Sequence, residues 1–199
     1  MQPADRSGDA RNSQFMTRLL TVWHRGSSAP GPYRQILVAS SATVTHRYRV
    51  DGEAEENLIW IEGRDISQDV LARAREELAH SSGEIFTFDL ARDVGVKSAS
   101  PTPWLYIVHT NIPSDIVDDY NAWYDEEHLP RLVDVPGVER ARRYIADDGQ
   151  SPRYLTAYDL SIKDAFESPE GLKARKTPWT ERMRSLFQNT RRKMCVLQK

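Results

Sequence analysis

The chain has 199 residues, a length that predicts one large domain or two small ones packed together. Its 27 basic and 29 acidic side chains give a formal net charge of −2, so the basic excess typical of nucleic-acid-binding proteins is missing. The single cysteine, Cys195, excludes an internal disulfide and a cage of cysteine ligands around a metal. The sequence has no run of about 18 apolar residues, and we therefore expect no membrane span and a cytoplasmic location.

The chain divides into a polar leader and two blocks. Residues 1–14 are polar and patternless, which predicts disorder. Small residues and two prolines gather over residues 91–103, as in a linker. We therefore expect one unit over residues 15–95 and another over residues 103–199.

The first block has the composition of a small mixed unit. Apolar and β-branched runs predict its strands, and an apolar stripe at helical spacing predicts its helix. A short apolar run over residues 19–23 stays unassigned. The strands are expected over residues 35–50, 57–62 and 85–90, and the helix over residues 67–80.

The second block has a clearer pattern of strand, helix, strand, strand, helix, strand. Ser114 is the candidate N-cap of its first helix, and Pro130 is expected to end that helix near Leu129. Pro178 is expected to interrupt the second helix. The strands are predicted over residues 104–110, 138–146, 154–160 and 193–197, and the helices over residues 114–129 and 169–188.

This βαββαβ order predicts an α+β fold with the ferredoxin-like arrangement, an antiparallel sheet with helices on one face. The other face would stay bare and apolar, so a second sheet has to cover it. We predict that residues 15–95 form a degenerate half, with a β-β-α-β order, that completes or flanks a barrel. Cover by a second chain, in a homodimer, stays open.

Candidate chemistry concentrates in the first helix of the second block. Tyr120, Tyr124 and His128 recur at intervals of four residues and share one helical face, with Trp123 on an adjacent stripe. Neutral histidine is well suited to exchange a proton near neutral pH. Packing explains aromatic residues at this spacing more often than catalysis does, and a histidine near a helix end can act through the helix dipole. Both roles stay open for His128, whereas packing explains Trp123 better.

Two neighbouring strands add polar candidates. His109 and Asn111 share a strand face, and His109 could open onto one pocket with His128 to give an acid and a base. A satisfied core histidine is the alternative. Arg142 and Arg143 point to opposite faces of their strand, and each needs an anion, either Glu127 or a substrate carboxylate or phenolate.

The remaining candidates are weaker. Tyr158 could line the pocket and Trp179 could close it, although packing explains both. Cys195 is expected to be a buried, inert thiol. No recognisable metal-ligand spacing is present, and we expect no metal site. Residues 111–128 hold six acids and no lysine or arginine, whereas residues 171–199 hold nine bases, so these two segments are expected to pair or to face solvent.

The second block resembles a known superfamily. The motif Trp123-Tyr124-x-x-Glu127-His128-Leu129-Pro130, with Asn111-Ile112-Pro113 before it and Val135-Pro136-Gly137 after it, is similar to the dimeric α+β barrel superfamily and within it to the EthD-like branch. The resemblance covers about residues 103–198. It implies a barrel, usually dimeric, with a ligand cleft between sheet and helices or inside the barrel.

The resemblance also implies several activities. Its members include cofactor-independent isomerases, cyclases and monooxygenases, and haem-binding enzymes. We expect a cofactor-independent acid-base enzyme of isomerase, cyclase, lyase or hydrolase type that acts on a small aromatic or polyketide-like catabolite. The alternatives are a non-catalytic binding or accessory protein and, as a minor case, a haem protein. The catalytic residues would be His128, Tyr124 and His109; the substrate-binding residues would be Asn111, Tyr120, Trp123, Arg142, Arg143, Tyr158 and Trp179.

Overall fold

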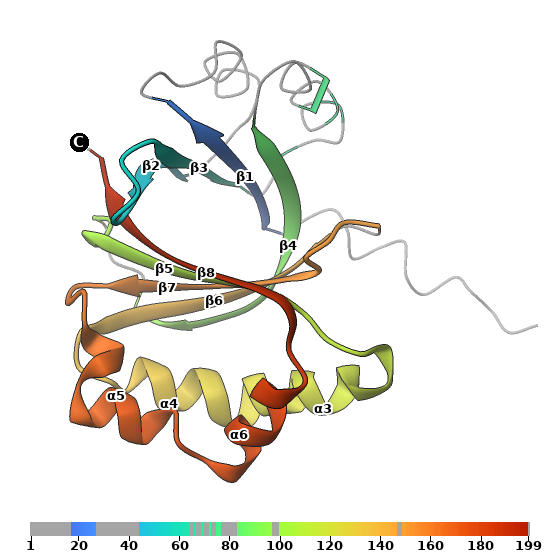
Figure 1. The fold of residues 1–199 in the computed structure, drawn as a ribbon, viewed down its shortest axis with the longest axis vertical. Helices are drawn as coiled ribbons and strands as arrows, with labels where there is room; N and C mark the ends of the chain where they lie inside the picture. Colours follow the sequence, from blue (N-terminus) through green and yellow to red (C-terminus); the bar gives the residue numbers. More distant parts are fainter. Residues whose placement is uncertain are drawn as a thin grey trace, which may run out of the picture.

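A computed structural model describes residues 17–26, 44–63, 66, 69, 72, 75–76, 83–96, 100–146 and 149–198. The described residues form eight strands that close into a barrel in the order β1-β3-β2-β8-β5-β7-β6-β4, with every neighbouring pair antiparallel (Figure 1). The strands are β1 (Arg18–Arg25), β2 (Val44–Val50), β3 (Glu56–Gly63), β4 (Glu84–Gly95), β5 (Trp104–Asn111), β6 (Val138–Ala146), β7 (Tyr154–Leu160) and β8 (Gln188–Leu197).

The barrel consists of an N-terminal half, β1–β4, and a C-terminal half, β5–β8, which meet at two seams. One seam is short and pairs Tyr48–Val50 of β2 with Cys195–Leu197 of β8. The other is long and pairs β4 with β6, from Phe88 opposite Ala146 to Gly95 opposite Arg140. The inner face of β5–β8 is therefore covered within one chain. The homodimer and the description of residues 15–95 as a degenerate copy stay predictions.

Helices cover the outer face of the C-terminal half (Figure 1). Aromatic and aliphatic side chains of this face and of the helices form one core, and the barrel interior forms a second. Alternating residues of each strand supply the two cores. The helical segments are a 3₁₀ turn η2 (Ser114–Ile116), α3 (Val117–Ala122), a π-helical segment η3 (Trp123–His128), α4 (Leu129–Val133), a 3₁₀ turn η4 (Ala165–Glu167), α5 (Pro169–Ala174) and α6 (Pro178–Ser185).

The predicted strands are largely confirmed. The strands over residues 138–146 and 154–160 have the predicted bounds, and the unassigned run 19–23 lies in β1. The linker prediction was wrong for residues 91–95, because β4 continues to Gly95 through its pairing with β6. The last strand begins at Gln188 instead of residue 193, because it pairs with β5 along its length. Residues 1–16 and 35–43 and most of the predicted helix 67–80 lie outside the described residues.

The first helix of the second block departs from its prediction at both ends. Ser114 makes no capping hydrogen bond, and the 3₁₀ turn precedes the helix. Pro130 does not end the helix, which continues to Val133. In the π-helical segment the Leu129 N–H donates to the Tyr124 carbonyl five residues earlier, so Pro130 enters a widened turn instead of a regular α-turn. The interruption of the second helix before Pro178 is confirmed, and that helix ends at Ser185.

An ion triad crosses the barrel interior between its two halves. The Arg142 guanidinium on β6 contacts the Glu62 carboxylate of β3 at 2.5 Å and the Asp159 carboxylate of β7 at 2.7 Å. Arg142 also lies over the Trp60 ring at 4.9 Å, and the Trp60 indole N–H donates to Glu62. The two carboxylates are the anions that the sequence analysis expected for Arg142, and Glu127 is not its partner.

No helix of the described residues is long and apolar enough to cross a membrane.

Replacing Arg142 by methionine should destabilise the fold. The change leaves Glu62 and Asp159 buried without their cation, and removing one partner of a buried ion pair costs about 3–5 kcal/mol in the free energy of unfolding. Urea unfolding followed by circular dichroism measures the loss. Arg182→Met is the matched control, because Arg182 forms an exposed ion pair with Asp119 and should change stability little. Equal stabilities of the two variants would contradict this role of the triad.

Candidate functional site

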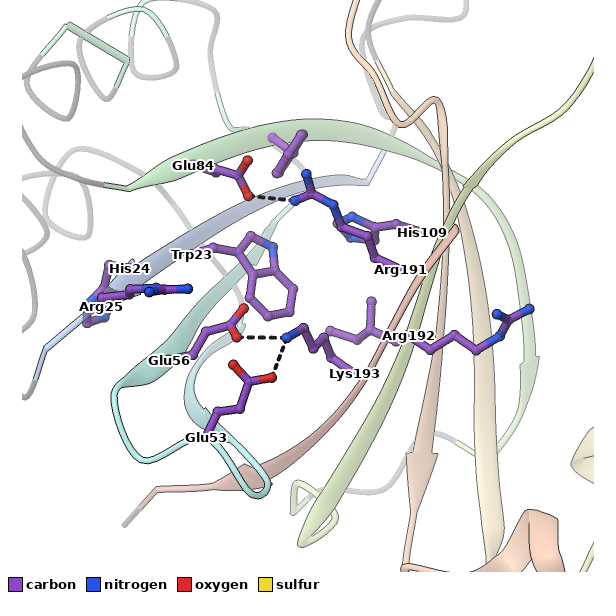
Figure 2. A pocket seen from close by; sticks show the side chains of 12 residues that line it. Trp23, His24, Arg25, Glu53, Glu56, Glu84, His109, Arg191, Arg192 and Lys193 are labelled. Atoms are coloured by element: carbon purple, nitrogen blue, oxygen red, sulfur yellow. Dashed lines mark hydrogen bonds and ion pairs between the residues drawn. The ribbon is translucent and has the colours of Figure 1, made fainter. Parts of the chain in front are cut away.

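In the described part of the chain, the two faces of the C-terminal half of the sheet each border a cavity. The helix-side cavity has a volume of about 190 Å³ and lies between the strands and the helices. The barrel cavity has a volume of about 550 Å³ and opens at one end of the barrel (Figure 2). The helix-side cavity is lined by Tyr106, Val108, Trp123, Tyr124, His128, Leu132, Tyr158, Phe166, Arg175, Arg184, Phe187 and Arg192.

The π-helical segment places His128 in the helix-side cavity. The His128 imidazole stacks on the Trp123 ring with centroids 4.0 Å apart and meets the Tyr124 ring edge-on at 5.2 Å. In the α-helix predicted by spacing, Trp123 would lie on a separate stripe. The wider π-turn brings residues five apart onto the same face, so Trp123 joins the row of Tyr124 and His128.

His128 is an uncharged imidazole at neutral pH. Its pKa is lowered to about 3, mainly by burial and in addition by the nearby charges of Arg184 and Arg175. Its Nδ1 atom is buried and has no hydrogen-bond partner in the described part of the chain. A neutral imidazole offers one hydrogen-bond donor and one acceptor, and one of the two makes no hydrogen bond to the described residues.

Phenol groups surround this imidazole. The Tyr124 hydroxyl accepts a hydrogen bond from Thr156 Oγ1 at 3.0 Å. Tyr158 lines the cavity, and burial raises the pKa of its phenol well above the ordinary value. Tyr120 lies behind Tyr124 with ring centroids 4.9 Å apart, and burial raises the pKa of its phenol well above the ordinary value. The phenol groups are therefore protonated at neutral pH wherever their pKa is raised, and can donate to an oxyanion.

Three arginines line the mouth of the cavity. Arg175 is paired with Glu167, whereas Arg184 and Arg192 have no ion pair within the described residues. Desolvation lowers the pKa of Arg184, and the charges of Arg175 and Arg192 lower it further. The mouth therefore carries an excess of positive charge next to aromatic walls. A carboxylate or phenolate fits this environment.

The structure separates residues that the sequence grouped together. His109 and Arg142 point into the barrel, whereas His128 lies on the helix side of the same sheet. The expectation that His109 and His128 open onto one pocket was wrong. The reason is strand alternation, which sends His109 inward and Val108 outward.

Three other candidates, and Cys195, lie outside the helix-side cavity. Arg143 lies on the helix side but behind the cavity, where it donates to Asn121 Oδ1 and covers the Tyr120 and Tyr124 rings at 4.8 and 4.7 Å. Asn111 binds the loop at Ser151 and Arg153. Trp179 donates its indole N–H to Asp119 instead of closing a pocket. Cys195 is buried, and burial raises its pKa to about 12, as expected for an inert thiol.

The sequence prediction missed the cavity's arginines and Tyr106. Arg184 and Arg192 belong to the basic segment 171–199, so charge asymmetry was the available signal. Part of that segment does pair with acids, since Arg182 contacts Asp119 at 2.9 Å. The sequence could not show which bases pair and which stay available. Among the described residues, no group of three or more histidine, cysteine or acidic side chains could hold a metal.

Comparison with solved structures shows the fold. No family model matches the sequence, and no curated protein matches it. A ferredoxin-fold protein related to antibiotic biosynthesis monooxygenases from Listeria monocytogenes matches with a TM-score of 0.61 at 9% identity, over 94% of this chain and 97% of that one. An anthrone oxidase-like protein matches with a TM-score of 0.61 at 14% identity, over 92% of each chain. A chlorite dismutase variant from Candidatus Nitrospira defluvii, in complex with cyanide, matches with a TM-score of 0.60 at 12% identity, over 92% and 91%.

These likenesses cover nearly the whole chain, including its N-terminal half. They show a mixed α+β, ferredoxin-like fold. At this level of identity the neighbours establish the architecture alone.

Acidification should destabilise the protein through two of its buried histidines, His109 and His128. Burial lowers the pKa of His128 to about 3 and that of His109 to about 4, from 6.5 in the unfolded chain. The unfolded state therefore binds more protons below pH 6.5, and stability is lost as the pH falls from 6.5 toward 4. At pH 4.5 each histidine should lower the free energy of unfolding by about 2–3 kcal/mol.

Urea unfolding at pH 7 and pH 4.5 measures this loss. The His128→Gln variant should lose less stability than the wild-type protein over this interval, because its glutamine does not titrate. The same pH dependence in both proteins would show that His128 is protonated in the folded state.

Proposed function

We propose that the chain is an enzyme that catalyses cofactor-independent proton transfer on a small aromatic acid or phenol in the helix-side cavity. The reaction class is an isomerisation, cyclisation or bond cleavage by acid-base chemistry. One observation carries the proposal. The neutral His128 imidazole has a buried nitrogen without a hydrogen-bond partner in the described residues. It lies among phenol groups in a cavity that is also lined by Arg184 and Arg192, which have no ion pair in the described residues.

The cavity volume narrows the substrate class. A cavity of about 150 Å³ can hold benzene, so about 190 Å³ suits one aromatic ring with a small substituent. The same volume favours a small ligand over haem, whose macrocycle is several rings wide. The stacking of His128 against Trp123 also leaves one face of the imidazole occupied by the protein. These residues do not fit a haem, and no step is assigned to one.

Substrate binding would prepare His128 for proton transfer. Two of the causes that lower its pKa are the charges of Arg184 and Arg175. A substrate anion beside these arginines neutralises part of that charge, so the pKa of His128 rises on binding. Since a base works best with a pKa near the ambient pH, the change favours proton abstraction from the bound substrate.

Phenol groups would complete the acid-base set. The raised pKa of Tyr158 keeps its hydroxyl protonated, and the Tyr124 ring meets the imidazole ring edge-on. A protonated phenol can donate a hydrogen bond to the enolate or phenolate that forms when His128 takes a proton. Return of that proton to another atom of the substrate completes an isomerisation with no co-reactant.

The fold neighbours support an aromatic substrate. One is named as anthrone oxidase-like, and another is related to antibiotic biosynthesis monooxygenases. Deprotonation of an acidic C–H or O–H group would be the first step for this chain whichever reaction follows. We assign the chain to the EthD-like branch on its motif Trp123-Tyr124-x-x-Glu127-His128-Leu129-Pro130.

A non-catalytic binding protein is the second candidate. It is favoured by the pKa of about 3 for His128, which makes a weak base as long as no anion is bound. The two candidates share the binding site and differ in turnover.

Salicylate, a one-ring aromatic anion, should bind the helix-side cavity and depend on its arginines. Replacing Arg184 by glutamine should weaken binding about tenfold, because a charge-assisted contact is lost. Isothermal titration calorimetry measures the dissociation constants. Arg182→Gln is the control, since Arg182 lies on the same helix outside the cavity lining and is paired with Asp119. Equal losses in both variants would contradict an anion site at this mouth.

Proton transfer can be tested with phenylpyruvate, a one-ring acid with an exchangeable CH₂ group. The protein should accelerate exchange of this group with D₂O, and His128→Gln should reduce the rate by roughly 100-fold or more. Proton NMR follows the exchange, and salicylate binding checks that the variant keeps its cavity. An unchanged rate in His128→Gln would overturn the catalytic role. Salicylate binding without exchange in the wild-type protein would favour the binding protein.

A further inference from the structure

The barrel cavity is lined by an aromatic floor and a charged rim. Trp23 of β1, Phe86 of β4 and His109 of β5 form the floor. The His109 ring meets the edges or faces of Trp23 and Phe86 at centroid distances of 5.9 and 5.5 Å. Figure 2 shows the Trp23 and His109 side chains between the N-terminal strands and the pair β5 and β8, and Phe86 lines the same cavity. The volume of about 550 Å³ lies within the roughly 300–1,000 Å³ of small-molecule sites.

Two polar groups of this floor lack a hydrogen-bond partner in the described residues. Trp23 Nε1 and His109 Nε2 are both buried and have no hydrogen-bond partner in the described residues. Only 8% of Trp23 and 4% of His109 is exposed. The indole nitrogen is a donor only, whereas a neutral imidazole nitrogen is either a donor or an acceptor. A hydroxyl group can accept from Trp23 and can match His109 in either tautomer, because it both donates and accepts.

The rim is charged but balanced. Arg191 pairs with Glu84 at 2.8 Å, and Lys193 pairs with Glu53 and Glu56 at 2.7 and 2.8 Å (Figure 2). Arg25 is the third cation facing these three acids. Arg192 also borders the barrel cavity, but its side chain points to the other side of β8, where it lines the helix-side cavity. The balance gives no preference for an anion, in contrast to the helix-side cavity.

We propose that the barrel interior is a second ligand site, which takes an uncharged hydroxy-aromatic molecule through Trp23, His109 and Phe86. The aromatic rings of the floor supply the apolar contacts. The indole N–H of Trp23 and Nε2 of His109 bind the ligand hydroxyl. The burial that keeps His109 uncharged, with its pKa at about 4, suits a neutral ligand. The site is independent of the function proposed for the helix-side cavity.

The rim ion pairs define how this site would open. Each pair joins a residue of the N-terminal half to one of β8, so together they bridge the mouth. Arg191 and Glu84 are each more than half exposed, and exposed ion pairs contribute little to stability. Arg191 and Glu84 can therefore separate with little loss of stability when a ligand enters.

The test uses 2-naphthol as the probe and 2-methylnaphthalene as a comparator of similar shape without oxygen. Calorimetry should show that 2-naphthol binds and that the comparator binds about tenfold more weakly, since the hydroxyl contacts are lost. Trp23→Phe keeps the aromatic ring but loses the N–H, and should weaken 2-naphthol binding about tenfold. His128→Gln is the control for the helix-side cavity and should leave 2-naphthol binding unchanged.

An NMR titration of the wild-type protein keeps the test independent of the variant's folding. The chain has five tryptophans, and the indole N–H signal missing from Trp23→Phe identifies that of Trp23. Addition of 2-naphthol should shift this signal in the wild-type protein. The proposal would be overturned if the Trp23 signal did not move or if the two naphthalenes bound equally well. It would also be overturned if binding depended on His128 instead of Trp23.

Discussion

The architecture depends on the charge that Arg142 carries into the barrel. Its guanidinium is nearly fully buried and contacts one carboxylate from each half of the chain, Glu62 and Asp159. A buried charge has to be paired, so the N-terminal sheet has to lie against the inner face of the C-terminal sheet. Backbone pairing closes the two seams, but the short seam between β2 and β8 joins only three residue pairs. The triad therefore adds a link between the halves across the barrel interior, beside the two backbone seams.

Closure within one chain gives the C-terminal sheet two different faces. The inner face lines a barrel with aromatic side chains and a buried ion triad, whereas the outer face packs against helices. The side chains of consecutive residues in one strand therefore lie in different environments. Arg191 pairs with Glu84 at the barrel mouth, while the next residue, Arg192, lines the helix-side cavity. One strand thereby separates a rim of balanced charge from a cavity mouth where Arg184 and Arg192 have no ion pair in the described part of the chain.

The sequence predicted the C-terminal half better than its site. Strand alternation and turn residues placed β6 and β7 at their observed bounds, because those signals are local. The i, i+4 spacing correctly predicted that Tyr120, Tyr124 and His128 lie together. The spacing could not predict the stack of Trp123 on His128. That contact depends on the π-helical segment before Pro130, and the spacing assumed a regular α-helix. The partners of Arg142 were also beyond prediction, because Glu62 lies 80 residues away in the chain.

The π-turn and the arginines act on the same imidazole in different ways. The turn fixes His128 against Trp123 and away from water, which lowers its pKa through desolvation, the largest cause. The charges of Arg184 and Arg175 add to that effect from the mouth of the cavity. Desolvation is permanent in the folded protein, whereas the charge effect disappears when an anion sits beside the arginines. By thermodynamic linkage, an anion that raises the pKa of His128 must itself bind more tightly when His128 is protonated. Affinity for an anionic ligand should therefore rise as the pH falls toward the pKa of the bound state, for as long as the fold survives.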